Sequence, residues 1–184
     1  MRANIRINEL TRVVIVGAGL GGLELAMRLR KSGFQVVIVD KNNYNQFPPL
    51  IYQVASAGLE PSSISFPLRR IFQGYKQYFC RMAEVKDIDV KEKAIHTSVG
   101  TIHYNYLVLA MGGTTNFFGN EDIERHALPM KTVEDAMALR NHILLDLERA
   151  ETEEDAEKRQ KYMNFVIVGA GPSGVEIAGA LAEL

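Results

Sequence analysis

Two short glycine phrases stand out because their residue types and spacing could hold a phosphorylated ligand. Gly17–Gly22 reads GAGLGG, and Gly169–Gly174 reads GAGPSG. Each phrase follows an apolar β-branched run and opens a helical pattern, so each is expected at a strand-to-helix turn. The free N–H groups and partial positive charge of a helix N-terminus attract phosphates, and glycines let the backbone approach a pyrophosphate. The pattern therefore predicts two dinucleotide-binding turns.

The two phrases belong to a longer internal repeat. Residues 13–29 align with residues 165–181, and ten of the 17 aligned positions are identical. The two copies lie 152 positions apart, as Gly17 and Gly169 show. This spacing is too long for a solenoid repeat and suits two domains of one architectural type.

Within the first phrase, each glycine has a separate physical task. Gly17 supplies the unusual dihedral angles of a tight turn, Gly19 leaves room for a pyrophosphate, and Gly22 lets the helix pack close to the strand. Asp40, 23 residues after Gly17, ends the next predicted strand, where a carboxylate can accept hydrogen bonds from an adenosine ribose. A turn that merely packs a helix on a strand is the alternative, but it does not account for this acid.

The rest of the N-terminal half reads as an α/β fold. We predict a buried strand at 13–16, a helix at 20–31 and a second strand at 34–40, with the two strands parallel. Residues 41–60 read as an aromatic-rich loop, and a short helix is expected at 66–72. Residues 78–110 read as short strands that form a β-meander and return to the main sheet.

In the C-terminal part, Thr132 and Asp135 predict a capping box that opens a long helix. The expected apolar stripe of this helix comprises Val133, Ala136, Met137, Ile143, Leu144 and Leu147. The charged run 151–161 is expected to be the solvated end of the helix or a surface loop. A buried strand is predicted at 165–168 and a helix at 174–184. In the second copy, the following strand and its acid would lie beyond residue 184, so a preference for NADH or NADPH is not readable.

Composition excludes several classes of function. The chain of 184 residues has a formal net charge of −1, which gives no basic excess for nucleic-acid binding. Its apolar runs are too short to cross a bilayer, and its N-terminus lacks the apolar core of a secretory signal. With one cysteine and four scattered histidines, we expect no disulfide and no metal site. A cytoplasmic setting is expected.

Four stretches carry a resemblance to a known family: VVIVGAGLGGLELA, FPPLIYQVASAGLEPSSISFPLR, LVLAMGGTTNFFG and FVIVGAGPSGVEIAGALAEL. Together they resemble the flavoproteins with two dinucleotide-binding domains, the FAD-dependent pyridine nucleotide-disulfide oxidoreductase superfamily. The pattern is most similar to the type II NADH dehydrogenases, which are non-pumping NADH:quinone oxidoreductases. The second and third stretches are more specific than either glycine phrase.

The resemblance implies a Rossmann-like FAD/NAD(P)-binding three-layer fold with a β-meander and a second dinucleotide-binding domain that is only begun. We expect residues 1–115 to be the first part of the FAD domain, and residues 116–184 to hold a linker, a helix and the start of the NADH domain. Glu176 matches a family glutamate near the nicotinamide and is the one candidate catalytic residue. The implied cofactor-binding residues are Gly17, Ala18, Gly19, Leu20, Gly21, Gly22, Asp40, Lys41, Pro49, Leu50, Gln53, Val85, Ala110, Met111, Gly112, Gly169, Gly171 and Gly174.

The implied reaction moves a hydride from NADH to FAD and then two electrons to a quinone. The chain departs from the family pattern at Asn45, where His is frequent, and at Met111, where Thr is frequent. The remainder of the family fold would supply the quinone-facing segment and peripheral membrane contact, so residues 1–184 alone are expected to be inactive, with a homodimer possible. The alternatives are a ferredoxin-, rubredoxin- or sulfide:quinone-type reductase, or a non-catalytic nucleotide-binding fragment.

Overall fold

A computed structural model describes residues 3–6 and 8–184 and divides the chain into two compact units. The first unit contains the residues up to Gln46 together with Ser65–Gly113, and the second contains Phe47–Ile64 and Thr114–Leu184. Each unit is therefore built from two separate segments of the chain.

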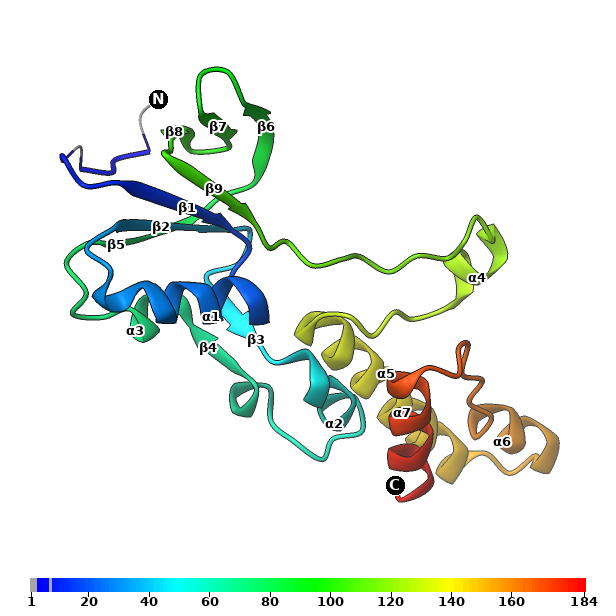
Figure 1. The fold of residues 1–184 in the computed structure, drawn as a ribbon. Helices are drawn as coiled ribbons and strands as arrows, with labels where there is room; N and C mark the ends of the chain where they lie inside the picture. Colours follow the sequence, from blue (N-terminus) through cyan, green and yellow to red (C-terminus); the bar gives the residue numbers. More distant parts are fainter. Residues whose placement is uncertain (1–2, 7) are drawn as a thin grey trace. The chain divides into compact units, whose positions relative to one another are not determined.

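The first unit is built on a four-stranded parallel sheet with the strand order β5-β2-β1-β9 (Figure 1). These strands are β1 (Arg12–Val16), β2 (Gln35–Asp40), β5 (Tyr78–Met82) and β9 (Tyr106–Leu109). In register, Val14 of β1 faces Val37 of β2 on one side and Leu107 of β9 on the other. The predicted strands at 13–16 and 34–40 and their parallel pairing are therefore confirmed.

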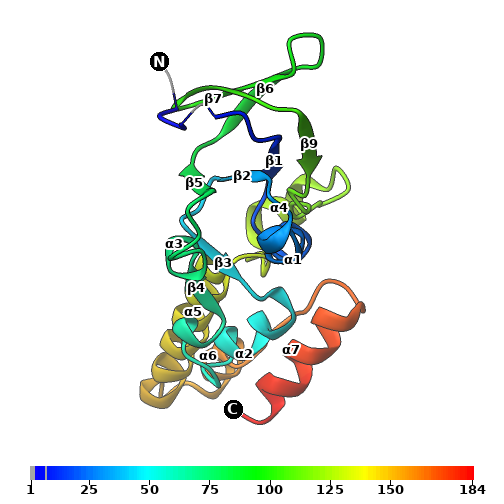
Figure 2. The same cartoon turned by 60° about the vertical axis from the view of Figure 1, so that its left-hand side comes forward.

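Both faces of this sheet are covered, which explains why its central strands are apolar throughout. On one face lie α1 (Leu20–Arg28), which continues as a 3-10 turn (Leu29–Lys31), and α3 (Leu68–Ile71). On the other face lies an antiparallel meander of β6 (Val85–Asp89), β7 (Ala94–Thr97) and β8 (Gly100–His103) (Figure 2). The expected α/β class and three layers are thus present, but the meander is confined to β6–β8, because β5, which was expected in it, pairs with β2 in the parallel sheet.

Alternate residues of β1 enter the two hydrophobic layers. Ile15 packs toward the helix side, and Val14 packs toward the meander side. A strand with period-two side chains must be apolar on both faces when both faces are buried. Cys80 of β5 belongs to the helix-side layer, and burial raises the pKa of its thiol, although the positive charges of Arg69 and Arg81 act in the opposite direction.

Two expected features of residues 41–72 were wrong in detail. The segment predicted as loop contains β3 (Tyr44–Gln46) and α2 (Ile51–Ala55). The helix expected at 66–72 is reduced to α3, because β4 (Ser65–Pro67) pairs with β3 in a small antiparallel ribbon. Pro67 is the N-cap of α3, in an extended conformation.

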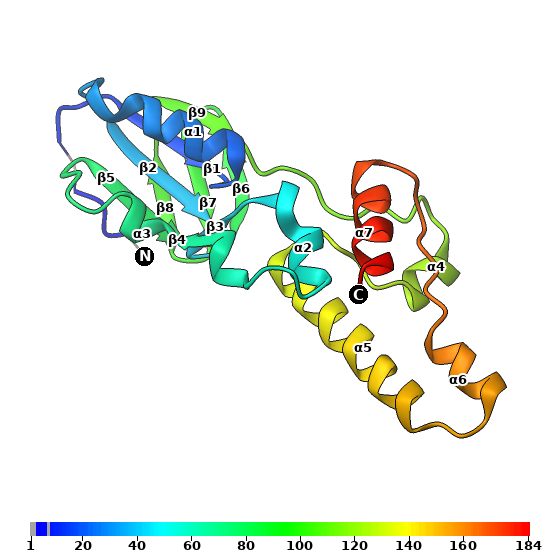
Figure 3. The ribbon, with the colours of Figure 1, turned by 90° about the horizontal axis from the view of Figure 1, so that it is seen from below.

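The second unit is helical. Figure 3 shows α2 beside α7 (Pro172–Ala182) and next to the start of α5 (Val133–Thr152). Ile51 and Val54 of α2, Val133 and Ala136 of α5 and Ile177 of α7 form its hydrophobic cluster. The Thr132–Asp135 capping box is confirmed, with the Asp135 N–H donating to Thr132 Oγ1 over 3.1 Å. Along the predicted stripe, Leu144 is instead exposed.

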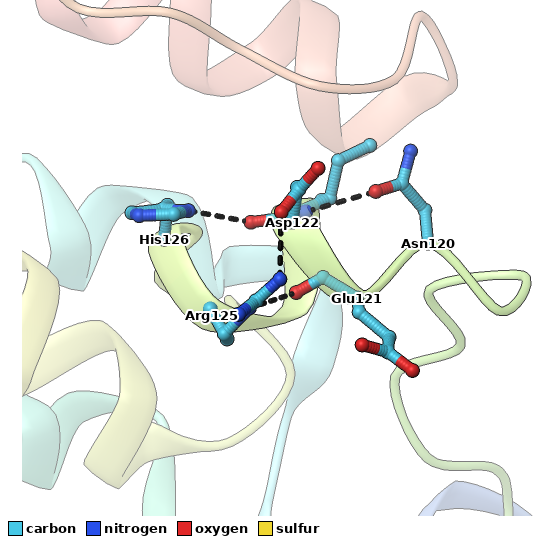
Figure 4. Close-up of polar contacts among 6 residues, drawn as sticks. Asn120, Glu121, Asp122, Arg125 and His126 are labelled. Atoms are coloured by element: carbon cyan, nitrogen blue, oxygen red, sulfur yellow. Dashed lines mark hydrogen bonds and ion pairs between the residues drawn. The ribbon is translucent and has the colours of Figure 1, made fainter.

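Two shorter helices complete this unit, α4 (Glu121–His126) and α6 (Ala156–Tyr162). Figure 4 shows polar contacts within α4 and its cap: Asn120 Oδ1 accepts from the Ile123 N–H, and Arg125 pairs with Asp122 at 2.8 Å. The charged run 151–161 was predicted as solvated helix end or loop, but it contains α6, which Asp155 caps by accepting from the Glu157 N–H. Both helices are exposed.

The predicted buried strand at 165–168 is wrong. These residues have no regular secondary structure and are exposed, with Val166 at 88%. A strand is stabilised by ladder hydrogen bonds to a neighbour, and none of the described residues pairs with this segment. The helix predicted next to it is present as α7.

Candidate functional site

The first glycine turn joins β1 to α1 at the carboxyl edge of the parallel sheet. Gly17 has a φ of +97°, and its N–H donates to the Val39 carbonyl over 2.8 Å. A Cβ at Gly17 would lie 2.2 Å from the carbonyl oxygen of Ala110, so a side chain is excluded there by both conformation and space. The turn therefore fits between two neighbouring strands only with glycine at this position.

Gly19 and Gly22 differ in their surroundings, as the sequence pattern predicts. A Cβ at Gly22 would lie 1.9 Å from the Gly17 carbonyl oxygen, so this glycine closes the helix onto the turn. Gly19 is the N-cap of α1, and a Cβ there would meet nothing within 4 Å. Gly21 is equally open. The first N–H groups of a helix lack intrahelical partners, so this side of the turn offers donors to an anion.

Asp40 lies beside this turn, at the end of β2. Its Oδ2 accepts a hydrogen bond of 2.6 Å from the Ala18 N–H, and its Oδ1 accepts one of 2.8 Å from the Asn42 N–H. A carboxylate has about four lone-pair positions, so two remain for hydroxyl donors. The carboxylate thus orients the turn and still has the capacity predicted for a ribose. The neighbouring Lys41 is exposed.

Two further predicted segments reach the same edge of the sheet. The Ala110 N–H donates to the Val16 carbonyl over 2.7 Å, which places the start of the Ala110–Gly112 turn against Gly17. The Ala83 N–H donates to the Asp40 carbonyl over 2.8 Å, and β6 begins two residues later at Val85. In open α/β sheets, ligands bind outside the carboxyl ends of the strands. The structure therefore brings the turn at Gly17, Asp40 and Ala110 together at this edge of the sheet, and the binding of a dinucleotide there stays a prediction.

The second glycine turn repeats the geometry of the first. Gly169 has a φ of +116°, and a Cβ at Gly174 would lie 2.0 Å from the Gly169 carbonyl oxygen. Gly171 caps α7 in an extended conformation and, like Gly19, has no atom within 4 Å of a Cβ position. Pro172 occupies the first helical position, where its missing N–H has no consequence. The turn is thus formed although the strand predicted before it is not.

The remaining predicted residues lie in the second unit. Pro49 and Leu50 are in a 3-10 turn (Pro48–Leu50) that leads into α2, which contains Gln53. Gln53 Nε2 donates to the Tyr52 hydroxyl over 3.1 Å. Their expected proximity to a flavin stays a prediction.

Glu176 lines a small pocket within the second unit. The pocket has a volume of about 70 Å³ and is lined by Pro48, Ile51, Tyr52, Met130, Lys131, Ser173 and Glu176. Three separate stretches meet there: the start of α2, the residues before α5 and the first turns of α7. The sequence patterns did not single out Lys131, which directly precedes the Thr132 cap.

Few side chains among the described residues have a shifted pKa or could join a metal site. No group of three or more metal-ligating side chains occurs among residues 3–6 and 8–184. Burial lowers the pKa of Arg12, the first residue of β1, and raises the pKa of Tyr78, the first residue of β5. Within the same described ranges, no helix has the length and apolar composition needed to span a membrane.

Comparisons with known proteins agree with this geometry. The sequence profile of the family described as pyridine nucleotide-disulphide oxidoreductase matches residues 11–184. The type II NADH:quinone oxidoreductase NdhA of Mycobacterium tuberculosis is 37% identical over 177 residues, covering 94% of this chain and 38% of the relative. The external alternative NAD(P)H-ubiquinone oxidoreductase B4 of Arabidopsis thaliana mitochondria is 32% identical over 184 residues, covering 94% of this chain and 31% of the relative. The chain thus spans well under half the length of these relatives.

Solved structures show the same similarity. NDH2 from Plasmodium falciparum in complex with NADH superposes with a TM-score of 0.85 at 25% identity, covering 95% of this chain and 37% of the other. The sulfide:quinone oxidoreductase of Aquifex aeolicus superposes with a TM-score of 0.69 at 26% identity, covering 76% of this chain and 32% of the other.

Proposed function

This chain belongs to the pyridine nucleotide-disulphide oxidoreductase family, and we propose that it is the N-terminal part of a type II NADH:quinone oxidoreductase. The proposed reaction transfers a hydride from NADH to FAD and two electrons from the reduced flavin to a quinone. The relatives named above as NADH:quinone and NAD(P)H-ubiquinone oxidoreductases support this reaction. The observation that carries it is the pair of glycine turns with matching geometry, since such an enzyme binds two dinucleotides.

FAD fits the first turn on structural grounds. The positions of Gly19 and Gly21 are open, and Gly19 is the N-cap of α1, where the first helical N–H groups lack intrahelical partners. Asp40 would hold the adenosine ribose, Val85 would lie near the adenine, and Ala110–Gly112 would approach the flavin half. The flavin supplies the hydride and electron chemistry, so the protein residues need only bind, orient and tune it.

NADH is assigned to the second turn. Gly169, Gly171 and Gly174 would seat its pyrophosphate, and Glu176 would lie near the nicotinamide. Pro49, Leu50 and Gln53 would lie beside the flavin ring or ribityl chain. The boundary near residue 115 between a flavin part and an NADH part, a homodimer, and peripheral membrane contact by the full-length protein remain parts of this proposal.

A thiol-based reaction is less well supported by this part of the chain. Its one cysteine, Cys80, is buried in a strand, and its pKa is raised by that burial. A reactive thiol is exposed and has a lowered pKa. A sulfide:quinone reductase would therefore need cysteines other than this one.

The test is a flavin spectrum followed by reduction. The full-length protein is expected to purify with a flavin absorbance that NADH bleaches and a soluble quinone restores. Residues 1–184 alone are expected to show weak or no turnover. A colourless full-length protein that binds neither nucleotide would contradict the proposal, and bleaching without reoxidation by any quinone would point to a ferredoxin- or rubredoxin-linked reductase.

A further inference from the structure

The pocket of the second unit brings one cationic and one anionic side chain to the same small space. Lys131 and Glu176 are the two charged residues among its lining residues. They come from different stretches, since Lys131 precedes α5 and Glu176 lies in the second turn of α7. The two residues therefore meet through the packing of these stretches, and not through the residue spacing of a single helix.

Both charged groups are left available to a ligand. Among the described residues, neither the Lys131 ammonium nor the Glu176 carboxylate takes part in a hydrogen bond or ion pair. The neighbouring acid, Asp135, is occupied, because its Oδ2 accepts from the backbone N–H groups of Lys131 and Thr132 over 3.1 and 2.9 Å. The Lys131 side chain is thus not needed for the helix cap.

The size of the pocket limits what enters it. Its volume of about 70 Å³ is roughly half of the ~150 Å³ cavity that admits a benzene ring. A planar substituent of three heavy atoms has room there. The apolar side chains of Pro48, Ile51 and Met130 form the rest of the wall.

The charges select the kind of substituent. A carboxylate would be attracted by Lys131 but repelled by Glu176, and an ammonium the reverse, so neither gains from both charges. A primary carboxamide matches both, because its oxygen accepts from the ammonium and its NH₂ group donates to the carboxylate. NADH carries one such group on its nicotinamide ring.

We propose that Lys131 is a specificity-determining residue of the NADH site, which donates to the nicotinamide carboxamide oxygen while Glu176 accepts from the amide nitrogen. This inference rests on the proposed function and adds to it a second charged residue and a chemical reason for nicotinamide recognition. It implies that the pocket discriminates against NADH analogues in which the amide is replaced by a carboxylate.

The test compares Lys131→Met, Lys131→Arg and the control Lys161→Met in the full-length flavoprotein. Lys161 is exposed on α6 and does not line the pocket, and Lys131→Met leaves the backbone bond to Asp135 intact. Lys131→Met is expected to raise the KM for NADH roughly ten-fold, with a smaller change in kcat. Lys131→Arg should recover most of the loss, and Lys161→Met should behave as wild type.

A substrate analogue gives the second measurement. With reduced nicotinic acid adenine dinucleotide, which carries a carboxylate in place of the amide, Glu176→Gln should lower the KM while it raises the KM for NADH. Lys131→Met should raise both. Thermal melting of each variant separates these effects from misfolding.

The outcomes separate the two claims. An unchanged KM in a folded Lys131→Met variant, or an equal loss in Lys161→Met, would overturn the role of Lys131 while wild-type NADH oxidation still supported the proposed function. A wild-type protein that does not oxidise NADH would overturn both.

Discussion

The two glycine turns have nearly the same backbone but opposite surroundings. Gly17 and Gly169 share a positive φ, and Gly22 and Gly174 approach the carbonyl of the first glycine equally closely. Yet Ile15 before the first turn is completely buried in a sheet, whereas the aligned Ile167 is 39% exposed and unpaired. The glycine sequence itself therefore specifies the turn, whereas the strand before it depends on hydrogen-bonding partners from elsewhere in the chain.

The largest expected effect comes from adding one methyl group to the helix-closing glycine. Gly22→Ala should destabilise the first unit by about 3 kcal/mol or more, because the Cβ would overlap the Gly17 carbonyl in a turn fixed between two strands. Gly174→Ala meets the same overlap in a turn outside any sheet, where the carbonyl can move, so we expect less than about 1 kcal/mol. Urea unfolding followed by circular dichroism measures both. Equal losses would show that the second turn is as fixed as the first.

The next effect concerns the ligands of the two turns. Gly19→Val should weaken FAD binding about 100-fold, or about 2.7 kcal/mol, because its side chain would occupy the open space expected for the pyrophosphate. Gly171→Val should leave FAD binding unchanged and weaken NADH binding instead. Flavin content after purification and NADH titration of the full-length protein give the two values. Unchanged flavin retention in Gly19→Val would contradict the assignment of the first turn.

A smaller effect is expected at Asp40, the carboxylate that lies beside the first glycine turn. Asp40→Ala removes the acceptor of the Ala18 N–H and should lower the free energy of unfolding by about 1–2 kcal/mol even without ligand. Asp40→Asn keeps one acceptor oxygen and should lose less stability. Chemical denaturation of the flavin-free protein separates this orienting role from ribose binding. A loss seen only with FAD present would mean that the hydrogen bond to Ala18 is dispensable.

The smallest effect comes from removing one methylene from each aligned isoleucine. Ile15→Val should cost about 0.5–1.5 kcal/mol, as expected for a filled core. Ile167→Val should be within about 0.5 kcal/mol of wild type because the side chain is partly in water. The same denaturation experiment measures both, and a matching loss at residue 167 would indicate that its segment is packed in solution.

Much of the first unit was predictable because its signals are local. Val13–Val16, the glycine turn and the run that ends at Asp40 each predict their own structure and their parallel pairing. The same reasoning failed at residues 165–168, since an identical run of side chains does not contain its own hydrogen-bonding partner. It also missed α2, because Tyr52 and the preceding prolines resemble an irregular loop when read without the helices that pack on Ile51 and Val54.

In the candidate site too, features encoded by one stretch of sequence were predictable, and features formed by distant residues were not. The roles of Gly17 and Gly22 followed from one stretch of sequence and are visible in the turn. The hydrogen bond from Ala18 to Asp40 and the meeting of Lys131 with Glu176 in one pocket were not predicted. Both arise from residues far apart in sequence, and no periodicity or motif links them.

The buried thiol of β5 has a practical consequence. Because Cys80 is protonated and shielded at neutral pH, a thiol reagent modifies it only during moments when the sheet around it opens. As the chain contains no other sulfhydryl, the labelling rate of a whole sample reports the breathing of one strand. The rate of thiol labelling therefore measures how often the sheet opens locally around β5.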